Sequence, residues 1–118
     1  MFVENQDKIE KRVFRRTSFK EPISYLFTDP EDDVGGCLGS DLSERGLCVN
    51  FNRFVRPKTD MVFKFRLSGA SDVLMAKGRV VWAHRVPCSD RYQLGIEFEE
   101  TNTRVQEDIR QYVGSHIK

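Results

Sequence analysis

The sequence predicts an all-β fold of five or six antiparallel strands, closed into a barrel or stacked as a sandwich, with one helix at the C-terminal end. Two patterns predict the strands. Apolar and polar residues alternate over short runs, and these runs follow one another with no helical segment between them. A third pattern predicts the helix, because the apolar spacing lengthens to that of one helical face over residues 101–117.

Composition places the chain among single-domain globular proteins. It has 118 residues, of which 39% are hydrophobic and 31% charged, and its formal net charge is +1. This length suffices for one core without disulfides or a metal. The near-zero net charge argues against a general nucleic-acid binder, because such domains are usually markedly basic.

Cysteine usage and hydropathy indicate the cellular compartment. The three cysteines, Cys37, Cys48 and Cys88, are odd in number and lack C-x-x-C spacing, so they predict neither a disulfide framework nor a metal site. No apolar run approaches the ~18 residues that span a bilayer, and no signal-peptide pattern follows the N-terminus. We therefore expect a cytoplasmic protein that does not enter a membrane.

The first third of the chain predicts one strand between two irregular segments. Residues 1–10 have no period and are expected to form a flexible lead-in. Apolar residues alternate over 19–27, where Pro22 favours an edge position or a late strand start. Residues 28–36 (TDPEDDVGG) are rich in Asp, Pro and Gly, so they predict an acidic loop, to which the sequence assigns no role.

Four further strands are predicted over residues 47–51, 61–67, 73–85 and 92–98. In the first of them Cys48 faces away from the apolar set and is expected to pack as a small apolar residue. Gly78 predicts a bulge in the long third run. Thr101 or Asn102 can cap the helix, and Gly114 is expected to weaken its last turn by about 1 kcal/mol relative to alanine.

A basic stretch, K-R-V-F-R-R, occupies residues 11–16. Guanidinium groups offer planar forks of donors that match phosphate oxygens or the O6 and N7 acceptors of guanine. Lys11, Arg12, Arg15 and Arg16 could therefore bind a compact anionic nucleotide. The alternative is an ordinary solvated charged surface, since arginines spaced four apart are common.

A second motif, D-L-S-E-R-G, occupies residues 41–46. The carboxylate of Asp41 can accept two parallel hydrogen bonds, which matches the N1–H and N2–H₂ donors of guanine. If the backbone is extended there, Ser43 lies on the same face as Asp41. Gly46 would allow a turn with positive φ and the close approach of an amide. The alternative is a local Asx- or Ser-turn that caps the strand beginning at residue 47.

These motifs together resemble the PilZ domain family. The segments that carry the resemblance are R-V-F-R-R, D-L-S-E-R-G-L about 25 residues later, G-R-V-V-W, and L-G-I-E-F before a C-terminal helix. Both halves of the family's R-x-x-x-R and [D/N]-x-S-x-x-G signature are intact, and the resemblance extends over residues 11–118. It implies a single domain that is a six-stranded antiparallel Greek-key-like β-barrel and binds the bacterial second messenger cyclic di-GMP.

The resemblance also implies roles for single residues. Arg12 and Arg16 are expected on the phosphates and guanine edges, and Asp41, Ser43 and Gly46 on a guanine. Lys11 holds the position that is often basic in members that bind two stacked ligands, so one or two molecules per chain are expected. Trp82 falls where some members place an aromatic or apolar side chain beside a base. The alternative is that it packs in the core or against the helix. Arg15 is at a variable position, either on a phosphate or in solvent.

The resemblance implies a receptor or adaptor without catalytic activity. Ligand binding would order the 11–16 segment and present a new surface to an unidentified effector protein. Two alternatives stay open: a PilZ-like interaction domain that needs no ligand, and a barrel that binds single-stranded nucleic acid through basic and aromatic residues. His84 and His116 lie near no nucleophile in the sequence, and no catalytic residue, metal site or cofactor is predicted.

Overall fold

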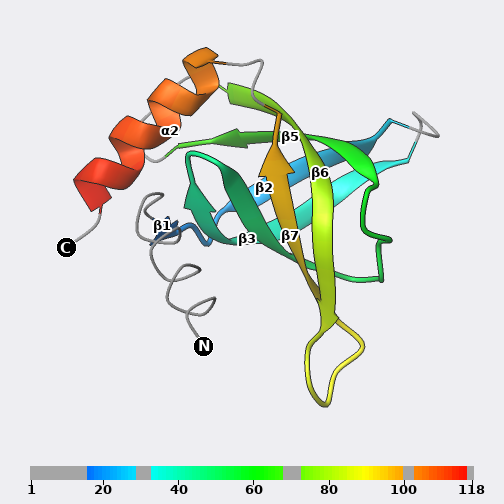
Figure 1. Ribbon diagram of the computed structural model, residues 1–118. Helices are drawn as coiled ribbons and strands as arrows, with labels where there is room; N and C mark the ends of the chain where they lie inside the picture. Colours follow the sequence, from blue (N-terminus) through cyan, green and yellow to red (C-terminus); the bar gives the residue numbers. More distant parts are fainter. Residues whose placement is uncertain (1–15, 29–32, 68–72, 100–102, 117–118) are drawn as a thin grey trace, which may run out of the picture.

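The structure, a computed structural model, describes residues 16–28, 33–67, 73–99 and 103–116 (Figure 1). The elements run in the order β1 (Arg16–Ser18), β2 (Pro22–Phe27), β3 (Val34–Ser43), β4 (Gly46–Phe51), β5 (Asp60–Arg66), β6 (Val73–Arg85), β7 (Tyr92–Phe98) and α2 (Thr103–His116). The expected lead-in over residues 1–10, and most of the basic stretch, lie outside the described residues.

The strands close into a barrel. All pairings are antiparallel, the sheet order is β1-β3-β2-β5-β6-β7-β4, and β3 also pairs with β4, so strands β2 to β7 form a ring of six. The short β1 and the longer β2 pair with the same edge of β3, one after the other along it, since β4 occupies the other edge. The predicted six-stranded antiparallel barrel with one C-terminal helix is confirmed.

The apolar residues of the alternating runs fill the barrel and the space beneath the helix. Helix α2 packs on β1, β3 and β6 through Val105, Ile109 and Val113, all of which are buried. Phe19 links the two parts, because its ring meets Phe65 edge-on at 5.5 Å and Tyr112 at 5.9 Å. Among the described residues, no helix has the length and apolar character needed to cross a membrane.

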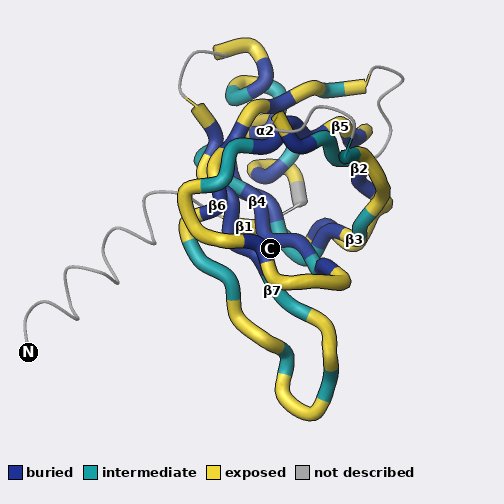
Figure 2. The backbone as a smooth tube through the Cα atoms, turned by 90° about the vertical axis from the view of Figure 1, so that its right-hand side faces the viewer, coloured by how far each residue is buried: buried dark blue, intermediate teal, exposed yellow. Residues whose placement is uncertain are grey.

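The β6–β7 hairpin extends beyond the barrel. Most residues between Arg85 and Arg91 are exposed, in contrast to the buried barrel portions of the same strands (Figure 2). Val86 N–H closes the hairpin on the Arg91 carbonyl at 2.8 Å.

The predicted loop over residues 28–36 is wrong in its second half, because β3 begins at Val34. Gly35 pairs with Tyr25, and a Cβ atom at Gly35 would lie 2.6 Å from the Tyr25 hydroxyl oxygen. Glycine here permits close approach of a ring to a strand, which from sequence looks like turn composition. For the same reason, no strand was predicted over the glycine-rich residues 34–43.

The expected bulge at Gly78 is also wrong. Gly78 pairs regularly with Met61 and Phe98, and the irregularity falls between Val80 and Trp82. A Cβ at Gly78 would lie 2.6 Å from Ile96 Cγ2, so this glycine makes room for a core side chain. Pro22 is the first residue of β2, so of its two expected placements, an edge strand or a late strand start, the structure shows the late start.

Candidate functional site

The strand register places the predicted site residues on the outer face of the barrel. Arg16 pairs with Ser43, which pairs with Gly46. In the next row, Asp41 of β3 pairs with Cys48 of β4, Cys48 with Gly95 of β7, and Gly95 with Trp82 of β6. Paired residues of antiparallel strands present their side chains on the same face. We call the row of Asp41, Cys48, Gly95 and Trp82 the site row.

Arg16 and Asp41 lie beside each other at one end of the site row. Arg16 Nη1 is 3.8 Å from Asp41 Oδ1, and the two side chains are 60% and 35% exposed. At this length the contact is an ion pair and not a hydrogen bond, so neither group satisfies the other. An exposed pair of this kind contributes at most about 1 kcal/mol to folding. The pair therefore adds little to the stability of the fold.

Ser43 and Gly46 shape the turn beside this pair. The Ser43 hydroxyl oxygen accepts the N–H groups of Arg45 and Gly46, each at 3.2 Å, and Ser43 is buried. This is the Ser-turn that the sequence left open as an alternative. Gly46 does not have the expected positive φ; instead, a Cβ there would lie 2.1 Å from the carbonyl oxygen of Ile96. Glycine at this position allows β7 to approach β4.

Trp82 forms a wall at the other end of the site row. Its indole lies over Gly95, where an added Cβ would be 2.2 Å from Trp82 Cε2. The ring stacks on His84, with centroids 4.8 Å apart and planes inclined by 27°. Trp82 is half-buried on the outer face, so it is not part of the barrel core. The missing side chain of Gly95 lets the indole lie flat against β7, where it forms an aromatic surface on the outer face.

Cys48 forms the floor between Asp41 and Trp82. It is 7% exposed although it faces outward. Burial and the nearby Asp41 carboxylate raise the pKa of the Cys48 thiol, against smaller opposing contributions from Ser40 and Arg16. The thiol is thus neutral and packs as a small apolar group, as the sequence predicted. On the inner face, burial raises the pKa of Cys37 to about 12.

We expect alkylation to distinguish the three cysteines. Cys88 is exposed at the hairpin tip, whereas Cys37 and Cys48 are shielded and have raised pKa values. Because the thiolate is the reactive form, iodoacetamide near pH 8 should modify Cys88 alone, as read by peptide mass spectrometry. The other two should react only after denaturant is added. Rapid labelling of Cys48 in the folded protein would contradict a closed floor.

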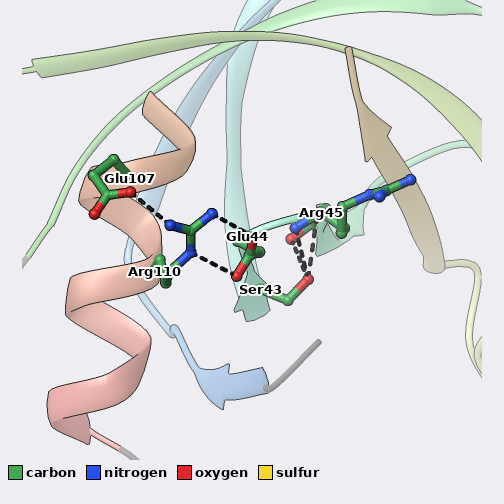
Figure 3. A network of polar contacts seen from close by, with 6 residues as sticks. Ser43, Glu44, Arg45, Glu107 and Arg110 are labelled. Carbon is green, nitrogen blue, oxygen red and sulfur yellow. Dashed lines mark hydrogen bonds and ion pairs between the residues drawn. The ribbon is translucent and has the colours of Figure 1, made fainter. Parts of the chain in front are cut away.

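The turn between β3 and β4 is tied to helix α2 (Figure 3). Arg110 donates from Nε to Glu44 Oε1 and from Nη2 to Oε2, both at 3.1 Å, and from Nη1 to Glu107 Oε2 at 2.6 Å. This fork-to-fork geometry is a strong and directional form of ion pair. The Glu44 carboxylate raises the pKa of Arg110, which therefore stays charged. Glu44 follows Ser43 directly, so the link joins the second motif to the helix.

The structure brings Arg16, Asp41, Ser43, Gly46 and Trp82 to one face. Lys11, Arg12 and Arg15 lie outside the described residues. The sequence did not reveal Gly95, His84 or the Glu44–Arg110 pair as parts of this region, because their positions depend on strand register and helix packing. In the described part of the chain, no three His, Cys, Asp or Glu side chains gather as a metal site.

Comparisons with solved structures find the same fold. MotI/DgrA, the inhibitor of motility from Bacillus subtilis, matches with a TM-score of 0.72 and 15% identity over 86% of this chain and 49% of its own. The PilZ domain of Escherichia coli YcgR with c-di-GMP matches at 0.66 and 11%, over 87% and 88%. The K. pneumonia MrkH–c-di-GMP complex matches at 0.69 and 11%, over 86% and 50%.

The chain thus spans about half the length of MotI/DgrA and of MrkH, and most of the isolated YcgR domain. Among curated proteins, no sequence matches this chain. The profile of the PilZ domain family matches residues 10–115, nearly the whole sequence. With that match and the shared barrel, the chain belongs to the PilZ domain family.

Proposed function

We propose that this protein is a cyclic di-GMP receptor. The observation that carries the proposal is the arrangement along the site row, in which the Arg16–Asp41 pair and the Trp82 wall lie on one outer face at the two ends of a floor made by Cys48. Two similar structures, YcgR and MrkH, are complexes with c-di-GMP. Family membership and this geometry support the same ligand here.

The groups of the site complement a guanine nucleotide. The Asp41 carboxylate can accept the N1–H and N2–H₂ donors of a guanine, while the Arg16 guanidinium can pair with a phosphate or with O6 and N7. Trp82 provides a stacking surface for a base. Ser43 stabilises the turn that follows Asp41, and Gly46 allows β7 to approach β4 closely at this turn. Lys11, Arg12 and Arg15 would add cations from the segment that leads into β1.

The proposal includes an adaptor mechanism. Ligand binding fixes the 11–16 segment across the outer face and presents an altered surface to an effector protein, without catalysis by this chain. One or two ligand molecules bind per chain; Lys11 holds the position that is often basic in family members that bind two. The cytoplasm, where the nucleotide is made, is the compartment in which such a receptor would act.

Isothermal titration calorimetry with cyclic di-GMP tests the proposal. We expect saturable binding with a stoichiometry of one or two, and no comparable heat with GTP or cyclic GMP at the same concentrations. Trp82 is the chain's only tryptophan, so its emission should change in the same titration if a base stacks on it. Absence of binding to cyclic di-GMP in the calorimeter would refute the receptor function.

A further inference from the structure

The outer face formed by β2, β5, the first half of β3 and the first half of β6 carries apolar and cationic side chains together. Three rows of paired residues build it: Val34–Leu26–Val62–Lys77, then Gly36–Ser24–Lys64–Met75, then Arg66–Val73. Val34, Val73 and Met75 are each more than half exposed. We call this surface the β2–β5 face.

A cavity of about 330 Å³ opens on the β2–β5 face. Its lining includes Ser24, Leu26, Val34, Val62 and Lys64. The surface is hollow along the Gly36–Ser24–Lys64–Met75 row because Gly36 and Ser24 have small side chains or none. A Cβ at Gly36 would meet nothing nearer than the Ile23 carbonyl oxygen at 3.8 Å. Larger apolar residues on the neighbouring row therefore form a wall. The volume is at the lower end of the range of about 300–1,000 Å³ that binding pockets have, which suits one bulky side chain and its flanking backbone.

The charge of the β2–β5 face is positive. Lys64, Arg66 and Lys77 point outward from adjacent strands and are exposed. Within the described ranges, no carboxylate forms an ion pair with any of the three. In the same ranges, two carboxylates border the face: Asp60, which is already held by Arg79 Nε at 2.9 Å, and Glu99, whose backbone N–H donates to the Lys77 carbonyl but whose side chain forms no ion pair with Lys77. Three cations around an apolar cavity favour a ligand that carries both an apolar group and negative charge.

We propose that the β2–β5 face binds an acidic segment of another protein, with one large apolar side chain in the cavity and carboxylates on Lys64, Lys77 and Arg66. An anchor residue in a pocket with a charged rim is a common arrangement of peptide-binding surfaces. In the ring of strands, β2 lies opposite β7 and β5 lies opposite β4. The face is therefore separate from the site row, and both can be occupied at once.

An anionic membrane fits this face less well than an acidic peptide. Each cation near a charged bilayer contributes only about 1 kcal/mol, so three of them hold a protein weakly. A concave cavity also gains little from a broad lipid surface, whereas it can enclose a single side chain.

The test uses a phage-displayed library of random twelve-residue peptides, selected on the whole protein. We expect enriched sequences that combine a Leu, Ile, Phe or Trp with at least two Asp or Glu residues. One such peptide, labelled for fluorescence anisotropy, should bind Lys64→Glu/Lys77→Glu at least about tenfold more weakly than the native protein. Ser24→Phe, which fills the cavity and keeps every charge, should weaken binding to a similar extent.

Arg91→Glu is the matched control, because Arg91 is an exposed cation at the β6–β7 hairpin, beyond the end of β6 that is far from the face; it should leave peptide binding unchanged. Circular dichroism and the titration with cyclic di-GMP establish that each variant is folded. The inference is overturned if no peptide is enriched, if the enriched peptides lack acidic residues, or if Ser24→Phe binds them normally. A second experiment tests the membrane alternative by sedimentation with phosphatidylserine vesicles. If the protein sediments with the vesicles and Lys64→Glu/Lys77→Glu abolishes this, the face binds a membrane and the inference is overturned.

Discussion

Arg16→Ala is expected to lower the affinity for cyclic di-GMP by roughly 5- to 150-fold. A bidentate contact from arginine to a base or phosphate is worth roughly 1–3 kcal/mol, and every 1.4 kcal/mol is about a tenfold change in affinity. Arg16 is 60% exposed and touches Asp41 only at 3.8 Å, so removing it should barely change the melting temperature. Calorimetric titration of the native and variant proteins measures the effect.

The controls for this prediction come from the same surface and from the helix. Asp41→Ala should show a loss of similar size, because it removes the acceptor for the Watson–Crick edge of guanine. Arg104→Ala, which removes an exposed arginine of α2, should bind normally. If Arg16→Ala and Asp41→Ala both keep native affinity, the ligand contacts a different part of the barrel.

Gly46→Ala is expected to destabilise the barrel strongly. Its new methyl group would lie 2.1 Å from the Ile96 carbonyl oxygen, a backbone atom that cannot rotate away. Either β4 and β7 separate or a ladder bond is lost, and overpacking of this kind costs about 3 kcal/mol. Thermal unfolding followed by circular dichroism should show a melting temperature lower by roughly 10 °C.

Gly114→Ala is the matched substitution for comparison. Gly114 lies in α2, and a Cβ there would meet nothing within 4 Å. The same glycine-to-alanine change should therefore raise stability, by about 1 kcal/mol at most, because alanine is the better helix former. Equal effects of the two substitutions would show that local crowding at Gly46 is not what decides its identity.

The sequence predicted what depends on periodicity and on an intact motif. Alternation located β4, β5, β6 and β7 closely, and helical spacing located α2. The signature predicted that Arg16 and Asp41 would contact the same ligand, and the structure places the two side chains 3.8 Å apart. Periodicity failed at β3, since Gly35, Gly36 and Gly39 give no apolar signal although each belongs to the strand.

Features that depend on register or on long-range packing could not be predicted. The site row needs the pairings of Asp41 with Cys48 and of Gly95 with Trp82, including the irregularity after Val80. Shifting a strand by one residue would reverse which face each side chain occupies, so no residue-level motif could reveal the row. Val62 is an apolar residue at an outward-facing position of β5, where the alternation predicts a polar one. Its apolar character is explained by the cavity on the β2–β5 face, which it lines.

The fork between Arg110 and Glu44 ties the C-terminal helix to the turn beside the proposed nucleotide site. Glu44 is fixed to α2 by two bonds while its neighbour Ser43 holds the backbone amides of the turn. Thermodynamic reciprocity then applies: if a nucleotide binding beside this turn loosens or tightens the helix, a protein that grips the helix must alter nucleotide affinity by the same factor. If the protein binds cyclic di-GMP as proposed, helix α2 is the place where a bound partner would change that affinity.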